Sequence, residues 1–296
     1  MIVVFGSINL DLIVPVPALP GPGQTVLGPA LRMEPGGKGA NQAVAAARDG
    51  APVVMAGAVG DDPFQAPALE RLRAAGVDLS RVAIVAENTG AALITVDPEG
   101  RNQIAVAAGA NRRAKAAAVE DAMLGPATML LLQMECDPEE TSALIRRARA
   151  RGARIILNLA PPAPLADDVL SAVDHLVVNE DEAEWLAART GSAADAAALG
   201  TKLATSVVRS LGARGAEAWS GGAMVRMPAQ RIVAVDTTAA GDCLAGVLAA
   251  ALDRGAPLPD ALQRAVAAAS ACCTRAGSQG SLPTAAETDA ALRMIA

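Results

Sequence analysis

Apolar runs rich in β-branched residues alternate with alanine-rich stretches along most of the chain. An apolar run without internal polar positions is typical of a parallel strand that is covered on both faces. The alternation predicts an α/β fold with a doubly wound, mostly parallel sheet and helices on both of its sides. Strands are expected at Ile2–Phe5, Pro52–Ala56, Thr128–Leu132, Arg154–Leu157, Leu176–Val178, Ser206–Arg209 and Arg231–Val235. Helices are expected at Ala40–Asp49, Gln65–Ala75, Pro138–Arg151, Glu182–Thr190, Ala193–Leu203, Gly241–Arg254 and Ala261–Thr274.

Two segments interrupt this rhythm. Residues 11–35 are rich in proline and contain only short β-like pieces such as Leu12–Val14. Residues 91–107 have the pattern of a hairpin, with a turn at Asp97-Pro98-Glu99-Gly100. Neither segment is long enough to form a core of its own. We therefore expect a single domain over residues 1–296, with a small β-sheet lid inserted from about 11–35 and 91–107.

Composition and charge exclude several classes of function. Hydrophobic residues make up 52% of the 296 residues and charged residues 19%, which excludes intrinsic disorder. Aromatic residues make up 1% and the net charge is −6, so we expect neither a nucleic-acid nor a membrane partner. The four cysteines have no zinc-type spacing and only one histidine is present, which favours buried thiols in a reducing, cytoplasmic setting.

The strongest local motif is Asp236-Thr237-Thr238-Ala239-Ala240-Gly241-Asp242, directly before a helix. Small side chains at Ala239, Ala240 and Gly241 let backbone N–H groups converge at the helix N-terminus, where the helix dipole attracts anions. Asp242 at that end is either a simple helix cap or a group beside a bound phosphate.

Glycines and polar residues gather in two further places. Gly36-Gly37-Lys38-Gly39-Ala40-Asn41 opens a helix without being a Walker loop, so it is either a tight turn or a close backbone approach to a polar ligand. Asn9 and Asp11, two residues apart after the first strand, point to one side. They are either turn formers or partners for vicinal hydroxyls.

Acidic residues follow the strand Leu176–Val178, in the run Asn179-Glu180-Asp181-Glu182. They are either ordinary partners of the helix dipole, or Asn179 and Glu182 lie near a phosphate or a hydrated Mg²⁺. The segment Ser210–Gly215 follows another strand and is a candidate for contact with a nucleotide.

Taken in order, these motifs resemble the ribokinase-like (PfkB) family of carbohydrate kinases over nearly the whole chain. Gly36–Asp62 is similar to the family's first signature and Asp236–Gly246 to its second, while Asn179 to Glu182 fits the Asn-x-x-Glu motif. Gly109-Ala110-Asn111 and Gln133-Met134-Glu135 also stand where family members carry similar stretches.

The resemblance implies a three-layer α/β domain with a β-sheet lid, and ATP-dependent phosphorylation of D-ribose at its 5-hydroxyl. It implies Asp242 as the general base, with Gly241, Ala240 and Ala239 forming the anion hole. By the same resemblance the sugar is held by Asn9, Asp11, Gly37, Lys38, Asn41 and Glu135, together with Asp242. The nucleotide is held by Asn179, Ser210, Gly212, Gly215 and Gly241.

The resemblance also implies metal ions, and the exposed edges of the lid predict an assembly. A K⁺-type monovalent cation is expected at Asp236, Thr238, Arg275, Gly277 and Ser281, and Mg²⁺ acts with ATP through an indirect contact to Glu182. A homodimer through the lid is expected, since exposed sheet edges need covering. Val266 replaces a polar residue that touches the nucleotide in many family members, and Ser210 replaces a commoner threonine. The alternatives are a kinase for deoxyribose, fructose or another furanose, and a catalytically silent sugar-binding regulator.

Overall fold

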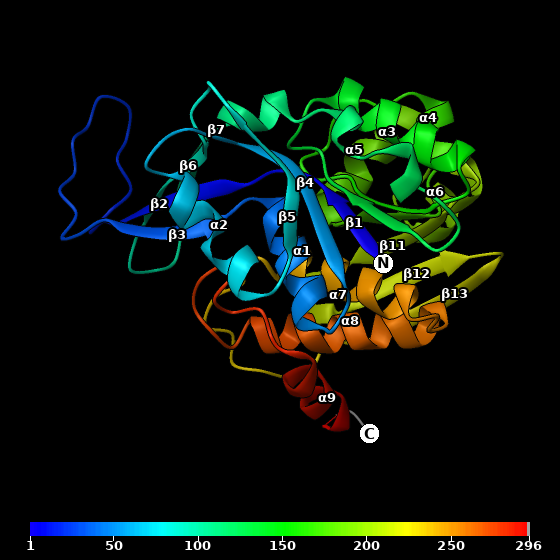
Figure 1. Cartoon of the computed structure of the whole chain (residues 1–296). Helices are drawn as coiled ribbons and strands as arrows, with labels where there is room; N and C mark the ends of the chain where they lie inside the picture. The colour runs from blue at the N-terminus through cyan, green and yellow to red at the C-terminus, as the bar shows by residue number, and fades with distance from the viewer. Residues whose placement is uncertain (295–296) are drawn as a thin grey trace.

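A nine-stranded sheet forms the centre of the molecule, for which the computed structural model describes residues 1–294 (Figure 1). Its strands are β1 (Ile2–Phe5), β4 (Val53–Gly60), β5 (Asp78–Val85), β8 (Met129–Leu132), β9 (Arg154–Asn158), β10 (His175–Val178), β11 (Ser206–Ser210), β12 (Ala216–Ser220) and β13 (Ala223–Met227). They follow the order β13-β12-β11-β10-β9-β8-β1-β4-β5. Neighbours from β11 to β5 are parallel, and β12 with β13 adds an antiparallel edge.

Helices cover both faces of this sheet. One layer contains α1 (Lys38–Arg48), α2 (Gln65–Ala74), α7 (Ala240–Asp253) and α8 (Leu258–Cys272). The other contains α3 (Pro138–Ala150), α4 (Asp167–Ser171), α5 (Glu180–Thr190) and α6 (Ala196–Leu203). Because successive strand residues point to opposite faces, Ile2 and Val4 belong to the first core, while Val3 and Phe5 belong to the second. The predicted three-layer α/β fold is confirmed.

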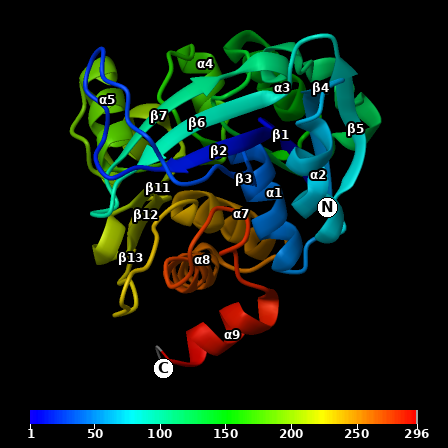
Figure 2. The ribbon, with the colours of Figure 1, turned by 90° about the vertical axis from the view of Figure 1, so that its left-hand side faces the viewer.

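A separate small sheet consists of β2 (Asn9–Pro15), β3 (Arg32–Gly36), β6 (Gly90–Val96) and β7 (Asn102–Ala107), in the order β3-β2-β6-β7. Figure 2 shows β2, β6 and β7 side by side in this sheet. The predicted hairpin is confirmed, since Ala91 pairs with Ala107 and Val96 with Asn102. Every residue of β7 is exposed, so this strand is an open edge.

The expected strand at Arg231–Val235 is wrong. These five residues are extended and exposed, and they pair with no strand. Their contact with α8 is a hydrogen bond from Val235 N to Cys273 O at 2.9 Å. The apolar side chains of Ile232 and Ala234 line a cavity instead of packing in the core. The strands β5, β12 and β13 and the helices α4 and α9 (Ala285–Arg293) were not anticipated from the pattern.

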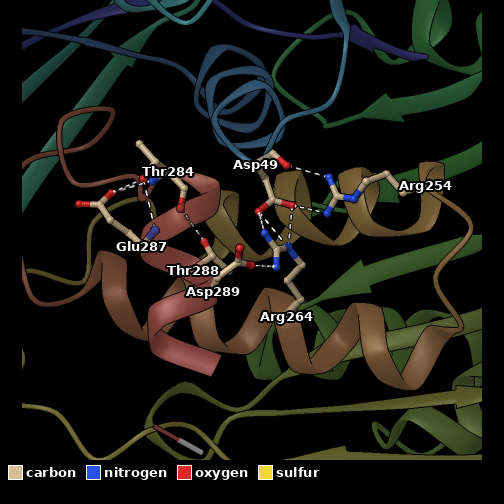
Figure 3. Close-up of polar contacts among 7 residues, drawn as sticks. All are labelled: Asp49, Arg254, Arg264, Thr284, Glu287, Thr288 and Asp289. Carbon is tan, nitrogen blue, oxygen red and sulfur yellow. Dashed lines mark hydrogen bonds and ion pairs between the residues drawn. The ribbon is translucent and has the colours of Figure 1, made fainter. Parts of the chain in front are cut away.

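An ion-pair cluster joins the carboxyl ends of α1 and α7 to the middle of α8 and α9 (Figure 3). Asp49, the C-cap of α1, has a fully buried side chain that accepts from Arg254 Nη2 and from Arg264 Nη2, each at 2.6 Å. Arg264 of α8 also reaches Asp289 of α9 at 2.5 Å. The cluster therefore anchors α1 at the end opposite to its glycine-rich start.

The composition led us to expect buried, unpaired cysteines. Cys136, Cys243 and Cys272 are buried, Cys273 is half-buried, and all four thiols are free, as expected. Among residues 1–294, no helix has the length and apolar character needed to cross a membrane.

Candidate active site

The first turns of α1 and α7 meet, and the side chain of Asp242 lies between them. This carboxylate is 7% exposed. Its Oδ2 accepts a hydrogen bond from Asn41 Nδ2 and its Oδ1 accepts one from Gln42 Nε2, both at 2.9 Å. The close approach of the two helices depends on Gly246, where a Cβ atom would lie 2.5 Å from Gln42 O. Helix α1 therefore holds both oxygens of Asp242.

A chain of carboxamides continues from Gln42 to the carboxyl ends of the central strands. Gln42 Nε2 also donates to Asn158 Oδ1 at 2.9 Å, and Gln133 Nε2 donates to Gln42 Oε1 at 2.7 Å. Asn158 Nδ2 in turn donates to Val177 O at 3.2 Å. Asn158 ends β9, and Gln133 directly follows β8. The sequence analysis missed this network.

A cavity of about 230 Å³ opens beside Asp242. Lys38, Asn179 and Glu182 line it together with Ser210 and the start of α7. The Asp242 carboxylate raises the pKa of Lys38 and outweighs the opposing effect of burial, so the ammonium group stays charged. Lys38 is therefore a cationic hydrogen-bond donor available to a phosphate group in this cavity, next to the carboxylates of Asp242 and Glu182.

Asn179 and Glu182 form a reciprocal helix cap at the start of α5. Asn179 Oδ1 accepts from Glu182 N, and Glu182 Oε2 accepts from Asn179 N, each at 2.8 Å. Burial raises the pKa of Glu182, although the hydrogen bond from Asn179 and the charge of Lys38 act to lower it. The sequence analysis did not anticipate this cap, and both of its residues also line the cavity.

Both helices at this site begin at a residue with positive φ. Gly37, the N-cap of α1, has a φ of 89°, and a Cβ there would lie 2.8 Å from Asn9 N. Ala239, the N-cap of α7, has a φ of 59°. Residues other than glycine adopt this left-handed backbone conformation at a cost of about 1–2 kcal/mol. A Cβ at Gly241 would meet no atom within 4 Å. The start of α7 is therefore unobstructed at Gly241, while Ala240 N donates to Thr237 O at 3.2 Å.

A second cavity of about 590 Å³ adjoins the first and shares Ser210 and Gly241 with it. Gly212 and Gly215 line the same space. Val266 also lines it, together with the apolar side chains Ile232, Leu244 and Ala269. The predicted nucleotide residues Ser210, Gly212, Gly215 and Gly241 thus border one cavity, and Asn179 borders the neighbouring one.

Two of the predicted sugar residues, Asn9 and Glu135, are held by hydrogen bonds to their neighbours. Asn9 Oδ1 accepts from Asn111 Nδ2 at 2.6 Å. Glu135 Oε2 accepts from Ser7 Oγ at 2.5 Å and from Lys38 N at 3.1 Å. These contacts join β2, α1 and the end of β8 at one place in the fold.

Asp11 lies in the most acidic part of the site. Burial and the charges of Glu135, Glu34 and Asp242 raise the pKa of Asp11 to about 7. A Cβ at Gly36 would lie 2.3 Å from Asp11 Oδ2, so the glycine leaves room for this carboxyl group. Asp11 therefore titrates near neutral pH.

The chain matches the model of the pfkB family of carbohydrate kinases over residues 1–285. It belongs to this family. It is 34% identical over 311 residues to the ribokinase of Schizosaccharomyces pombe, and the alignment covers 99% of this chain and 98% of that protein. It is 32% identical over 295 residues to a deoxyribokinase of Salmonella typhi, with 96% and 95% covered.

Solved structures of this family agree with the sequence comparison. The ribokinase of Thermotoga maritima has a TM-score of 0.90 and 30% identity, with 99% of both chains covered. Arabidopsis thaliana ribokinase, solved with ribose and ATP, has a TM-score of 0.87 and 28% identity, with 99% of this chain and 98% of that one covered. This pfkB-family protein is an ATP-dependent sugar kinase.

The predicted cation residues of this kinase lie around the loop that follows α8. Asp236 Oδ2 accepts from Gly277 N and its Oδ1 accepts from Thr238 N, each at 2.9 Å. Burial acts to raise the pKa of Asp236, but the hydrogen bonds from Thr238 and Gly277 outweigh it and hold the pKa below its usual value.

Two residues of the set use their side chains elsewhere. Arg275 pairs with Glu287 at 2.7 Å, and Ser281 Oγ donates to Ser278 O at 2.7 Å. Within residues 1–294 no group of three His, Cys, Asp or Glu side chains is placed to hold a metal ion. Asp236 is the one carboxylate of the predicted set, and its oxygens accept from Thr238 and Gly277.

Proposed function

We propose that this kinase transfers the γ-phosphoryl group of ATP to the 5-hydroxyl of D-ribose. The observation that carries the proposal is the environment of Asn41. Its Nδ2 holds Asp242, while its Oδ1 is buried without a hydrogen-bond partner within the described part of the chain. A buried acceptor without a donor costs about 1–3 kcal/mol, so we infer that a substrate hydroxyl donates to it. Asn9, Asp11, Gly37, Lys38 and Glu135 would contact the other hydroxyl groups.

In this proposal Asp242 is the general base. It accepts the proton of the 5-hydroxyl while the sugar oxygen forms its bond to the γ-phosphorus and ADP leaves. Negative charge on the transferring group faces the N–H groups of Ala239, Ala240 and Gly241 and the ammonium group of Lys38. Fixed donors of this kind stabilise a phosphoryl-transfer transition state without having to reorganise.

The larger cavity would hold adenosine, with Ser210, Gly212 and Gly215 beside the nucleotide. The valine at position 266 gives adenine an apolar wall. Glu182, a single carboxylate at the phosphate cavity, fits Mg²⁺ held mainly by phosphate oxygens and water. When bound, Mg²⁺ neutralises charge on the ATP phosphates. K⁺ would be held by Asp236, Thr238, Arg275, Gly277 and Ser281, mostly through backbone oxygens.

The choice of sugar is tested by ADP release over a panel of pentoses and hexoses, with and without K⁺. We expect the highest kcat/KM with D-ribose, because ribokinases are among the relatives of highest identity. Deoxyribose is the alternative, favoured by the deoxyribokinase relative. A higher kcat/KM with deoxyribose or fructose would overturn the ribose proposal, and absence of ADP release with every sugar would favour a silent regulator.

The role of Asp242 is tested by Asp242→Asn. The variant keeps the size of the side chain but cannot accept the proton, so kcat should fall about 10²–10⁴-fold. Ribose binding, measured by calorimetry, and the melting temperature should stay close to those of the wild type. A kcat near the wild-type value would overturn Asp242 as the base.

We further propose that the small sheet acts as a lid and joins two copies of the kinase in a homodimer. Its open strand β7 and the exposed side chains of Leu93, Ile104 and Val106, each more than half exposed, support this assembly. Sedimentation of a monomer at micromolar concentration would contradict it. A cytoplasmic location is proposed because the reaction needs ATP and the four thiols are free.

A further inference from the structure

The side-chain amide of Gln42 uses all of its hydrogen-bonding groups in the amide network of the candidate active site. Its two N–H groups donate to Asp242 Oδ1 and Asn158 Oδ1, both at 2.9 Å, and its Oε1 accepts from Gln133 Nε2 at 2.7 Å. Gln42 and Gln133 are almost completely buried, at 0% and 1% exposure. Both glutamines stand in stretches that resemble family motifs, but the sequence analysis gives neither of them a role.

The direction of these hydrogen bonds is set by the backbone and not by the charge of Asp242. Val177 O is a carbonyl, which can only accept, so Asn158 must present its Nδ2 there. Asn158 Oδ1 then faces Gln42, which must present its Nε2. It follows that Gln42 directs an N–H group at Asp242 and its Oε1 at Gln133, whichever protonation state Asp242 adopts.

Gln133 completes the network, and its polar side chain carries a free-energy cost that an apolar side chain would avoid. Its Oε1 is buried without a partner among the described residues. A Cβ at Gly6 would lie 2.0 Å from this oxygen, so the amide fits only because residue 6 is glycine. An apolar side chain of the same length would fill the space without a buried orphan oxygen. The amide is therefore explained by what its Nε2 does for Gln42.

We propose that Gln42 and Gln133 are positioning residues that hold Oδ1 of Asp242 and leave Oδ2 to receive the proton. A proton on Oδ1 would compete with the hydrogen of Gln42, whose direction the amide network fixes. Oδ2 instead faces Asn41, whose side chain lies outside that network and is free to adjust. This inference rests on the proposed role of Asp242 as the base.

Two methionine variants test the positioning role, since methionine keeps the length of glutamine but has no N–H. Gln42→Met should lower kcat about 10–100-fold, the effect of one hydrogen bond to a charged group, and Gln133→Met should lower it less, because Gln133 acts through Gln42. KM for ribose and for ATP should change less than about threefold. For Gln42→Met, the acid limb of the kcat–pH profile should move to higher pH, because a donor to the carboxylate is lost.

The variant Gln133→Glu gives a pH dependence of kcat that would be absent if Gln133 had only a structural role. A protonated glutamic acid still donates one hydrogen to Gln42 Oε1, whereas an ionised one cannot. The ratio of its kcat to that of the wild type should therefore fall as the pH is raised, while its melting temperature relative to the wild type serves as the measure of folding. A ratio that does not change with pH would overturn the role of Gln133.

The decisive comparison repeats the substitutions in the Asp242→Asn background. If the glutamines act through Asp242, they should lower kcat there by less than about twofold. Equal losses in both backgrounds, or unchanged kcat in the wild-type background, would overturn the inference while leaving Asp242 as the base. A near-normal kcat in Asp242→Asn alone would instead overturn the proposed function. The matched control is Thr141→Val, which removes a buried, unpartnered hydroxyl from α3 and should leave kcat unchanged.

Discussion

At the scale of single residues, the site concentrates carboxyl groups against very little positive charge. Glu34, Glu135 and Asp242 all act on Asp11, and Lys38 is the ammonium group that responds to Asp242 and Glu135. Such a site disfavours further negative charge on Asp11 and favours ligands that donate hydrogen bonds. Sugar hydroxyl groups are donors of this kind. The arrangement therefore separates a polyhydroxyl end from the phosphate end at Lys38.

The raised pKa of Asp11 predicts a pH dependence of both stability and sugar binding. The pKa of about 7 lies above the value of 3.8 for an unperturbed Asp, so the ligand-free fold loses stability as the pH rises through the range between them. Asp11→Asn removes this loss. Its melting temperature relative to the wild type should rise between pH 5 and pH 8, measured without sugar.

When sugar is bound, Asp11 should prefer its ionised form. Hydroxyl donors favour the ionised carboxylate, so ribose binding near pH 6.5 should release a proton and weaken at lower pH. Calorimetry in buffers of different ionisation enthalpy measures this release. Asp11→Asn should show no such buffer dependence, and proton uptake by the wild type would contradict the role of Asp11.

At the scale of elements, α1 connects the site to the ion-pair cluster at its other end. Its first turn supplies Lys38, Asn41 and Gln42, and its C-cap Asp49 is held by arginines of α7 and α8. The glycine at position 246 lets α7 lie against α1. The distance between Asp242 and its amide donors thus depends on how firmly these helices are joined.

The two carboxylates that share Arg264 provide a matched test of this anchoring. Asp49→Asn should lower the free energy of unfolding by about 3 kcal/mol, because the buried partner of two guanidinium groups loses its charge. Asp289→Asn should cost less than about 1 kcal/mol, since Asp289 is 51% exposed. Urea denaturation measures both changes, and equal effects would contradict the assigned importance of burial.

Buried helices and strands were easier to predict from the sequence than exposed ones. Continuous apolar runs located the central parallel strands, because such strands are covered on both faces. The edge strand β5 was missed, since polar residues fill most of its first half and only residues 82–85 form an apolar run. The run Arg231–Val235 was misassigned because an apolar segment that lines a cavity has the composition of a strand.

Candidate site residues could be predicted from the sequence where they lie near the start of a helix. Asn41 and Asp242 stand in glycine-rich or small-residue motifs, and the structure brings them into contact. The roles given to these residues remain predictions. Gln42, Gln133 and Asn158 were missed, because single polar residues at strand ends or in a helix acquire meaning only through partners about 90 to 200 residues away in sequence. Tertiary structure alone brings them together.

At the scale of the whole molecule, the small sheet touches the proposed cation loop. Ser278 Oγ donates to Pro35 O of β3 at 2.9 Å, and a Cβ at Gly277 would lie 2.8 Å from Glu34 Oε2. The same loop holds Asp236, which leads into Ala239 and the start of α7. Strand β3 also pairs with β2, where Asn9 and Asp11 lie. The proposed sugar residues, the proposed cation loop and the start of α7 are therefore joined by one continuous set of contacts.

This connection predicts that K⁺ and ribose bind cooperatively. K⁺ should raise kcat several-fold where Na⁺ does little, because small shifts at the start of α7 displace the N–H donors, and Asp236→Ala should abolish the response. K⁺ should also tighten ribose binding, measured by calorimetry without ATP, and ribose must then tighten K⁺ binding by the same factor. Ser278→Ala removes the contact with Pro35, so the effect of K⁺ on kcat should persist while its effect on ribose affinity declines.

A bulky organic cation at equal ionic strength and Mg²⁺ is the control. Wild-type ribose affinity that is the same in K⁺ and in this cation would contradict the coupling, and equal kcat in both would contradict the cation site itself.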